Sequence, residues 1–269
     1  MIQLILKKGK ISKEDVPLPK VARGTILVKV MYSCISTGTE IAALKATGGS
    51  LFRMALEQPG NIAKGLQLIK EKGIFSVAKN IKEKISDGSP VGYSVSGIVL
   101  DTGESVKDFT RGERVACAGT GYANHAEYVE VPYNLAAKIP EGLDFAPAST
   151  VALGAIALQG IRRAQVELGE YVVVFGLGII GQISLQLLKN AGCYVIGIDV
   201  EEKRLKVAAQ NGADLAIDAR KDSLEKEVFH FTGGYGADKV LFCASTDSSL
   251  ALHQAFQLAR KNGKIRRVL

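Results

Sequence analysis

The hydrophobic pattern of the chain changes its period near residue 145. Before that point, residues 1–50 and 91–139 alternate apolar and polar positions in short runs, of which ILVKVMYSC is the clearest. Turn signals at Asp101-Thr102-Gly103 and Arg111-Gly112-Glu113 interrupt the alternation. The first part of the chain, residues 1–143, is therefore predicted to be a mostly β domain.

Beyond residue 145 the pattern predicts strands that alternate with helices. Such alternation is typical of a parallel sheet with helices on both faces, so we expect an α/β domain over residues 144–269. A chain of 269 residues, 47% of them hydrophobic, can bury the cores of two such domains. The expected helices are 148–164, 179–190, 201–211 and 249–261, with another between 218 and 239, and the expected strands are 171–175, 194–199, 215–218, 239–243 and 264–269.

A lysine-rich segment, residues 51–86, separates the two strand-rich stretches of the first domain. Its apolar residues recur at helical spacing and predict an amphipathic helical insert with exposed lysines. Residues 45–84 hold eight Lys or Arg and three Glu, a local charge of +5 within a net charge of +7. This field could attract an anionic substrate, or the insert could contact another domain or be a solvated surface. The lysines concerned are Lys64, Lys70, Lys72, Lys79, Lys82 and Lys84.

The composition disfavours several classes of protein. Aromatic residues do not interleave the basic ones and no recognition motif accompanies them, so we expect no nucleic-acid partner. No apolar run approaches the roughly 18–20 residues that span a bilayer, and MIQLILKKGK is too short an apolar start for a secretory signal. The four scattered cysteines favour reduced, buried thiols. We therefore expect a cytoplasmic protein without membrane contact.

A glycine motif follows the first strand of the second domain. In YVVVFGLGIIGQ, Gly176, Gly178 and Gly181 stand between a β-branched strand and a helix, the context that a dinucleotide-binding loop requires. Gly176 permits the tight turn, Gly178 lets the backbone approach a pyrophosphate, and Gly181 lets the helix pack on the sheet. The amides at the helix start, including Ile179 and Ile180, offer partial positive charge to an anion.

An acidic residue at the end of the next strand strengthens this prediction. Asp199 lies 18 residues beyond Gly181, where a carboxylate can accept hydrogen bonds from the adenine-side ribose hydroxyls. It would repel a 2′-phosphate, which favours NAD(H) over NADP(H). The helix between them is predicted to bury the face formed by Ile180, Ile183, Leu187 and Ala191.

Longer segments resemble the medium-chain dehydrogenase/reductase superfamily. They are the glycine-loop region 166–199, TRGERVACAG (110–119) and HAEYVEVP (125–132). The resemblance implies a GroES-like catalytic domain followed by a Rossmann domain. It also places Arg204 near a ribose hydroxyl, although Arg204 could equally be an ordinary solvated side chain. YSCISTGTE, the insert 51–85, VGYSVSG and VALGAIALQGIRRAQ are similar to the amino-terminal half of bacterial bi-domain oxidoreductases. Those proteins carry a second, glucose–fructose-oxidoreductase-like half, and many are linked with surface-polysaccharide synthesis.

Some members of the superfamily hold a catalytic zinc. The same resemblance implies that this chain does not. The three ligand positions fall on Thr37, Tyr93 and Val151, which do not supply the nitrogen, sulfur or carboxylate ligands that zinc takes. The structural-zinc cysteines are missing too. Without a metal, hydrogen-bonding side chains must handle the proton. Thr39, Tyr93 and His125 are the candidates, although Thr39 could simply cap a turn and His125 could simply pack.

The carboxyl-terminal segment departs from the family pattern. GKIRRVL is the last strand that the pattern predicts, yet Arg266 and Arg267 stand where a parallel strand buried on both faces would be apolar. A sixth strand and the segment that completes the catalytic domain are not found, so we expect a truncated chain.

Two classes of function fit these features. The first is a zinc-independent, NAD(H)-dependent oxidoreductase that transfers a hydride to or from an alcohol or carbonyl of a small molecule, such as a sugar derivative. The second is a non-catalytic cofactor-binding or partner-docking domain of a larger bi-domain protein. Either class is compatible with a fused or separate second oxidoreductase domain and with a homo-oligomer.

Overall fold

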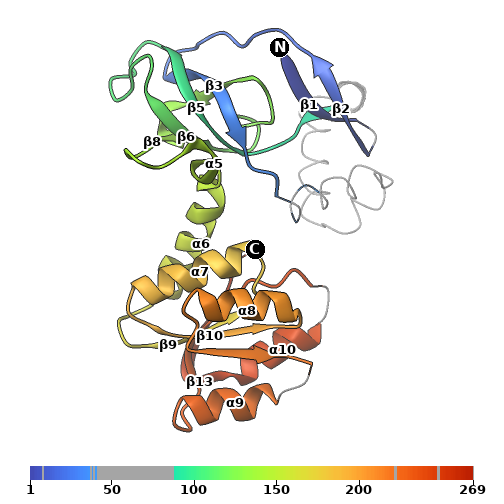
Figure 1. Cartoon of the computed structure of the whole chain (residues 1–269), viewed down its shortest axis with the longest axis vertical. Helices are drawn as coiled ribbons and strands as arrows, with labels where there is room; N and C mark the ends of the chain where they lie inside the picture. Colours follow the sequence, from blue (N-terminus) through green and yellow to red (C-terminus); the bar gives the residue numbers. More distant parts are fainter. Residues whose placement is uncertain are drawn as a thin grey trace, which may run out of the picture. The chain divides into compact units, whose positions relative to one another are not determined.

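The computed structural model describes residues 1–7, 9–36, 38, 40, 88–220, 223–246 and 249–268 (Figure 1). The chain divides into two compact units, Met1–Ala152 and Leu153–Leu269. The predicted helical insert 51–86 lies outside the described residues, as do Thr37 and Thr39. Within the described part, no helix is long and apolar enough to cross a membrane.

The described part of the first unit is built on two antiparallel sheets. One has the order β2-β1-β4 and the other β7-β3-β5-β6-β8. Alternate residues of β7 (Tyr128–Pro132) face inward, so Val129 and Val131 join the core with Val28, Val95 and Val115. The remaining elements are β1 (Ile2–Lys7), β2 (Lys10–Asp15), β3 (Thr25–Ser33), β4 (Ser89–Pro90), β5 (Ser94–Thr102), β6 (Arg114–Ala118), the 3-10 turn η1 (Tyr133–Leu135), β8 (Ala136–Lys138) and α5 (Phe145–Ala148).

A glycine in β5 permits a close approach of β5 to β3. Gly97 pairs with Val30 of β3, and a Cβ atom added to it would lie 2.1 Å from the carbonyl oxygen of Lys29. We predict that Gly97→Ala lowers the free energy of unfolding by about 1–3 kcal/mol through overpacking. Denaturant unfolding measures this loss. Gly154→Ala is the control, because an added Cβ there meets nothing within 4 Å; equal midpoints for the two variants would contradict the prediction.

The second unit is the expected parallel sheet with alternating helices. Its strand order is β11-β10-β9-β12-β13, and all four pairings are parallel. The strands are β9 (Tyr171–Phe175), β10 (Tyr194–Asp199), β11 (Leu215–Asp218), β12 (Ala237–Phe242) and β13 (Ala259–Arg267). The helices are α6 (Val151–Ala164), α7 (Ile179–Asn190), α8 (Glu202–Gln210), α9 (Leu224–Phe231) and α10 (Ser249–Gln257).

The central strands of this sheet are buried almost continuously, whereas β13 is largely exposed. In the described part of the chain β13 pairs only with β12, so it forms an edge of the sheet and Arg266 and Arg267 reach solvent. Helix α10 ends at Gln257, four residues before the predicted end. The reason is that Ala259 already pairs with Ala237 of β12.

The buried face of α7 differs from the prediction. The helix buries Ile180, Ser184, Leu185 and Leu188, while Ile183 and Leu187 are half-buried and Ala191 is exposed. Half of the positions of this helix are apolar and they are spread around it, so the sequence permits more than one face. Gly181 decides between them, because it packs directly on the loop at the end of β9.

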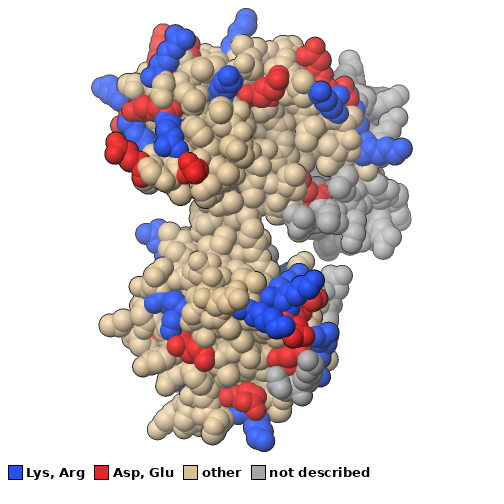
Figure 2. Space-filling view, viewed as in Figure 1, with Lys and Arg blue, Asp and Glu red and all other residues tan. Residues whose placement is uncertain are grey.

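Surface charge is mixed rather than concentrated. Figure 2 shows Lys and Arg interspersed with Asp and Glu on the visible face of each unit. Several charged side chains of the described residues are paired, as in Lys138–Glu113, Lys189–Asp214 and Arg260–Asp238. Burial raises the pKa of the Cys117 and Cys243 thiols to about 12, as expected for inert, reduced cysteines.

Candidate functional site

The loops that follow the strands of the parallel sheet meet at its carboxyl edge. The glycine loop follows β9, Asp199 ends β10, Asp218 ends β11, and Cys243 and Ala244 follow β12. The first and last of these loops touch, because a Cβ atom on Gly176 would lie 2.5 Å from the Ala244 nitrogen. This edge is where open α/β sheets bind their ligands.

The three glycines of the loop have different surroundings. Gly176 has a φ of 95°, which favours glycine, and a Cβ on Gly181 would lie 2.0 Å from the Gly176 carbonyl oxygen. At both glycines, the space that a side chain would need is therefore occupied by other atoms of the protein. Gly178, at the start of α7, has nothing within 4 Å of an added Cβ, and the next residue, Ile179, is exposed. The open space at a helix N-terminus fits a pyrophosphate.

Asp199 is tied to the glycine loop by a hydrogen bond. The Leu177 amide donates to its Oδ2 at 2.7 Å, and the Glu201 amide donates to its Oδ1 at 2.9 Å. The Asp199 side chain is only 4% exposed, and the Arg204 guanidinium, which is half exposed, lies 3.5 Å from Oδ2. These contacts orient the carboxylate beside the loop. Oδ2 has two donors, whereas Oδ1 has one and keeps capacity for another.

A second acid–arginine pair ends the neighbouring strand, and the sequence analysis missed it. The Arg220 Nε lies 3.2 Å from Asp218 Oδ1, and its Nη2 lies 3.3 Å from Oδ2. Hydrogen bonding to Asp218 and the charge of that carboxylate raise the pKa of Arg220. The sequence did contain a signal for this pair, because Asp218 closes the predicted strand 215–218 as Asp199 closes the strand 194–199. The edge therefore presents two carboxylates, each with its own arginine.

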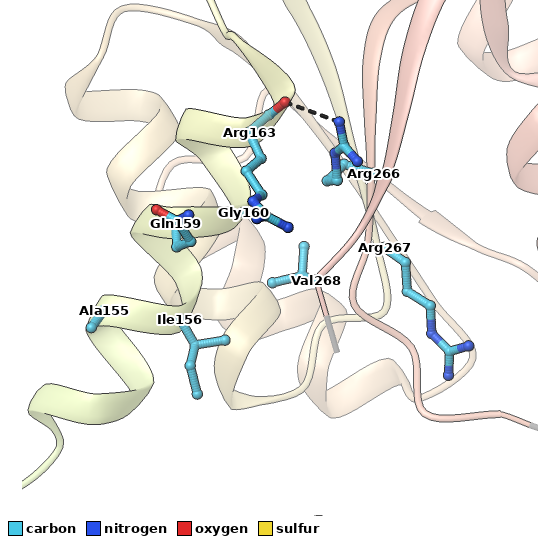
Figure 3. Close-up of a pocket in the computed structure, with 8 residues that line it drawn as sticks. All are labelled: Ala155, Ile156, Gln159, Gly160, Arg163, Arg266, Arg267 and Val268. Carbon is cyan, nitrogen blue, oxygen red and sulfur yellow. Dashed lines mark hydrogen bonds between the residues drawn. The ribbon is translucent and has the colours of Figure 1, made fainter. Parts of the chain in front are cut away.

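A cavity of about 380 Å³ lies between α6 and the carboxyl end of β13 (Figure 3). In the sheet register Arg267 lies beside Phe242, which lies beside Phe175, so this end of β13 belongs to the same edge as the glycine loop. Within the described residues, neither Arg163, Arg266 nor Arg267 forms an ion pair with a carboxylate; Arg266 donates instead to the Arg163 carbonyl oxygen. The other lining residues are Ala155, Ile156, Gln159, Gly160 and Val268.

In the first unit, the structure brings together the segments that contain Tyr93 and His125. Tyr93 is half-buried immediately before β5, and the preceding residue, Gly92, packs against His125: a Cβ on Gly92 would lie 2.9 Å from His125 Nδ1. His125 is buried, and its Nε2 lies 3.1 Å from Glu40 Oε1. The sequence analysis did not single out Glu40, because its partner lies 85 residues away. Thr39 lies outside the described residues.

The metal-ligand positions that are described carry Tyr93 and Val151. In the part of the chain that the structure covers, no group of three or more His, Cys, Asp or Glu is placed to hold a metal ion.

Known proteins resemble this chain in sequence and in fold. The family model described as "Zinc-binding dehydrogenase" matches residues 180–268. A D-guloside 3-dehydrogenase of Escherichia coli (strain K12) is 28% identical over 228 residues, which cover 80% of this chain and 59% of that protein. An alcohol dehydrogenase of Geobacillus stearothermophilus is 27% identical over 267 residues, 96% of this chain and 73% of that one. In sequence the chain is thus similar to dehydrogenases of the medium-chain dehydrogenase/reductase superfamily.

Solved structures of this superfamily match both units of the chain. The 2R,3R-butanediol dehydrogenase from Bacillus subtilis aligns with a TM-score of 0.75 and 22% identity, covering 99% of this chain and 77% of that chain. The alcohol dehydrogenase TADH from Thermus sp. ATN1 aligns with a TM-score of 0.76 and 20% identity, with the same coverage. The fold of a medium-chain dehydrogenase is thus present, while the chain spans 59% of the length of D-guloside 3-dehydrogenase.

Proposed function

We propose that the chain is an NAD(H)-dependent oxidoreductase that transfers a hydride to or from an alcohol or carbonyl. The observation that carries the proposal is the open Gly178 backbone at the start of α7, joined to Asp199 through the Leu177 amide. Gly176, Gly178, Ile179, Ile180 and Gly181 would hold the pyrophosphate. Bound there, the cofactor supplies hydride transfer.

The charges at the carboxyl edge support NAD(H) rather than NADP(H). The Asp199 carboxylate, buried at the end of β10, would repel a 2′-phosphate beside it. Both nearby arginines are engaged by carboxylates, Arg204 by Asp199 and Arg220 by Asp218, so neither is a spare cation for a phosphate. Calorimetric titration of the protein with NAD and with NADP tests this part of the proposal, and tighter or equal binding of NADP would refute it.

A sugar derivative is the substrate class that we propose. Support comes from the similarity to a D-guloside 3-dehydrogenase and, at 30% identity over 207 residues, to a sorbitol dehydrogenase of Halalkalibacterium halodurans. The arginines of the cavity beside β13 favour a substrate with negative charge. From the resemblance to the amino-terminal half of bacterial bi-domain oxidoreductases, we also propose that a further oxidoreductase domain, fused or separate, acts with this chain.

Zinc independence is the third part of the proposal. Tyr93 and Val151 stand at ligand positions and offer zinc no suitable atoms, so Thr39, Tyr93 and His125 are proposed to contact the substrate instead.

We predict that the purified protein holds no stoichiometric zinc. Elemental analysis of protein expressed in zinc-supplemented medium and then dialysed should find far less than one zinc per chain, and treatment with a chelator should leave the thermal midpoint unchanged. About one tightly held zinc per chain, or a chelator-induced loss of stability, would show the prediction to be wrong.

A further inference from the structure

We propose that the cavity between α6 and β13 is a binding site for a small phosphate ester, whose phosphate group is held by Arg163 and Arg266. The inference goes beyond the proposed function, because the site lies wholly within the second unit and does not depend on hydride transfer. The residues that line the cavity come from α6, from the end of β13 and from the residue after it, and none belongs to the glycine loop.

The two arginines bring positive charge that no described carboxylate neutralises to one cavity. Arg266 donates through Nη2 to the Arg163 carbonyl oxygen at 3.3 Å, which holds its side chain against the end of α6 (Figure 3). That bond uses one of the five N–H donors of Arg266, and the Arg163 guanidinium donates to no described residue. Two like charges in one cavity repel each other, and an anion that contacts both would offset this repulsion.

The charge and the donors of this pair match a phosphate ester better than a carboxylate. A phosphate monoester carries nearly two negative charges at neutral pH and has three strong acceptor oxygens. Two guanidiniums supply two positive charges and two planar forks of donors that suit such oxygens. A carboxylate has one charge and two oxygens, so it would occupy one fork and leave the second cation unmatched. The pair therefore fits the head of a phosphate monoester.

The rest of the cavity suits a ligand body of monosaccharide size. Its volume of about 380 Å³ lies near the lower end of the range for small-molecule sites, roughly 300–1,000 Å³, and is small for a dinucleotide. Ile156 and Val268 provide apolar surface, and the exposed Gln159 offers an amide to hydroxyl groups. Gly160 lets α6 pack directly on Val268, because an added Cβ would lie 2.9 Å from Val268 Cγ1.

Position in the fold does not by itself explain the pair. Basic residues are common in the last turn of a helix, but that holds equally for Arg162, which does not line the cavity. A charge on an edge strand discourages pairing with a further strand, and Lys264 and Arg267 serve that purpose on β13 as well. In Figure 3 Arg267 extends away from Arg163, whereas Arg266 lies against the end of α6.

Calorimetric titration of the full chain with glucose 6-phosphate tests the site. The wild type should bind this ester with a dissociation constant below about 1 mM at low ionic strength, and added salt should weaken the binding. Arg163→Gln and Arg266→Gln should each raise the dissociation constant about tenfold. Arg162→Gln is the matched control, because it makes the same change of charge one residue away and should leave the constant within about twofold.

Other ligands separate the parts of the proposal. Inorganic phosphate should bind more weakly than the ester, and uncharged glucose should not bind measurably. Ala155→Phe adds a ring at an exposed position of the cavity wall, so it should weaken the ester more than inorganic phosphate. Displacement of the ester by phosphatidylcholine vesicles that contain phosphatidic acid, or equal affinity for the ester and inorganic phosphate, would overturn the assignment to a small ester.

NAD supplies the last distinction. The three arginine variants should keep the NAD dissociation constant and the thermal midpoint of the wild type, since the glycine loop does not line the cavity. Competition between NAD and glucose 6-phosphate would overturn the proposal, and so would one dissociation constant for the ester shared by Arg162→Gln, Arg163→Gln and Arg266→Gln. A wild type that binds the ester but not NAD would support this site and refute the proposed function.

Discussion

Replacing Gly178 with alanine is expected to weaken NAD(H) binding at least about tenfold while leaving the fold intact. The φ of Gly178 is −65°, which any residue adopts, and an added Cβ meets no atom within 4 Å. The free protein therefore has room for the methyl group. A bound pyrophosphate would not, because the methyl group fills the space through which the backbone approaches it. Each lost amide–phosphate hydrogen bond costs about 1.5–3 kcal/mol, or roughly 10- to 150-fold in affinity.

Two measurements separate binding from stability for this variant. The thermal midpoint should stay within a few degrees of the wild type, and the NAD dissociation constant should rise at least about tenfold. Gly181→Ala provides the contrast, because its Cβ would lie 2.0 Å from the Gly176 carbonyl oxygen and should damage both properties. NAD binding of wild-type strength in Gly178→Ala would place the dinucleotide elsewhere.

Replacing Asp199 with alanine is expected to abolish the preference for NAD over NADP. The variant loses the acceptor for the ribose hydroxyls and the charge that repels a 2′-phosphate. Loss of hydrogen bonds to a charged group should weaken NAD binding by about 10- to 150-fold. The affinity for NADP should stay the same or increase, since Arg204 is then released from its carboxylate. Calorimetric titration with both cofactors measures the ratio.

The control for this variant is Asp214→Ala. Asp214 also accepts a backbone amide, that of Val195 at 2.6 Å, and also pairs with a cation, Lys189. It lies at the opposite, amino edge of the same sheet, because its partner Val195 is the second residue of β10 and Asp199 is the last. Both variants should lose stability, but only Asp199→Ala should change the cofactor ratio. If the two variants keep the same ratio as the wild type, Asp199 does not select the cofactor.

Patterns that depend on neighbouring residues could be interpreted without the structure. Strands β9, β10 and β11 begin and end where the hydrophobic runs predicted, and α7 runs from Ile179 to Asn190 as expected. The reason is that strand and helix periods are local, and buried parallel strands are apolar throughout. The glycine loop is local too, because each glycine serves the turn in which it stands.

Contacts between distant residues were decided by the tertiary structure alone. The hydrophobic period of α7 allows several faces, and the approach of Gly181 to the Gly176 carbonyl selects one. Glu40 and His125 are 85 residues apart and meet where β3, which precedes Glu40, pairs with β7, which follows His125. Asp218 and Arg220 are near in sequence, yet their place at the ligand edge depends on the strand order. Thus the sequence by itself determined the fold class and the phosphate loop, through short-range periodicity and backbone chemistry. Only the packed sheets determined which charges face each other, because burial and pairing are properties of the whole chain.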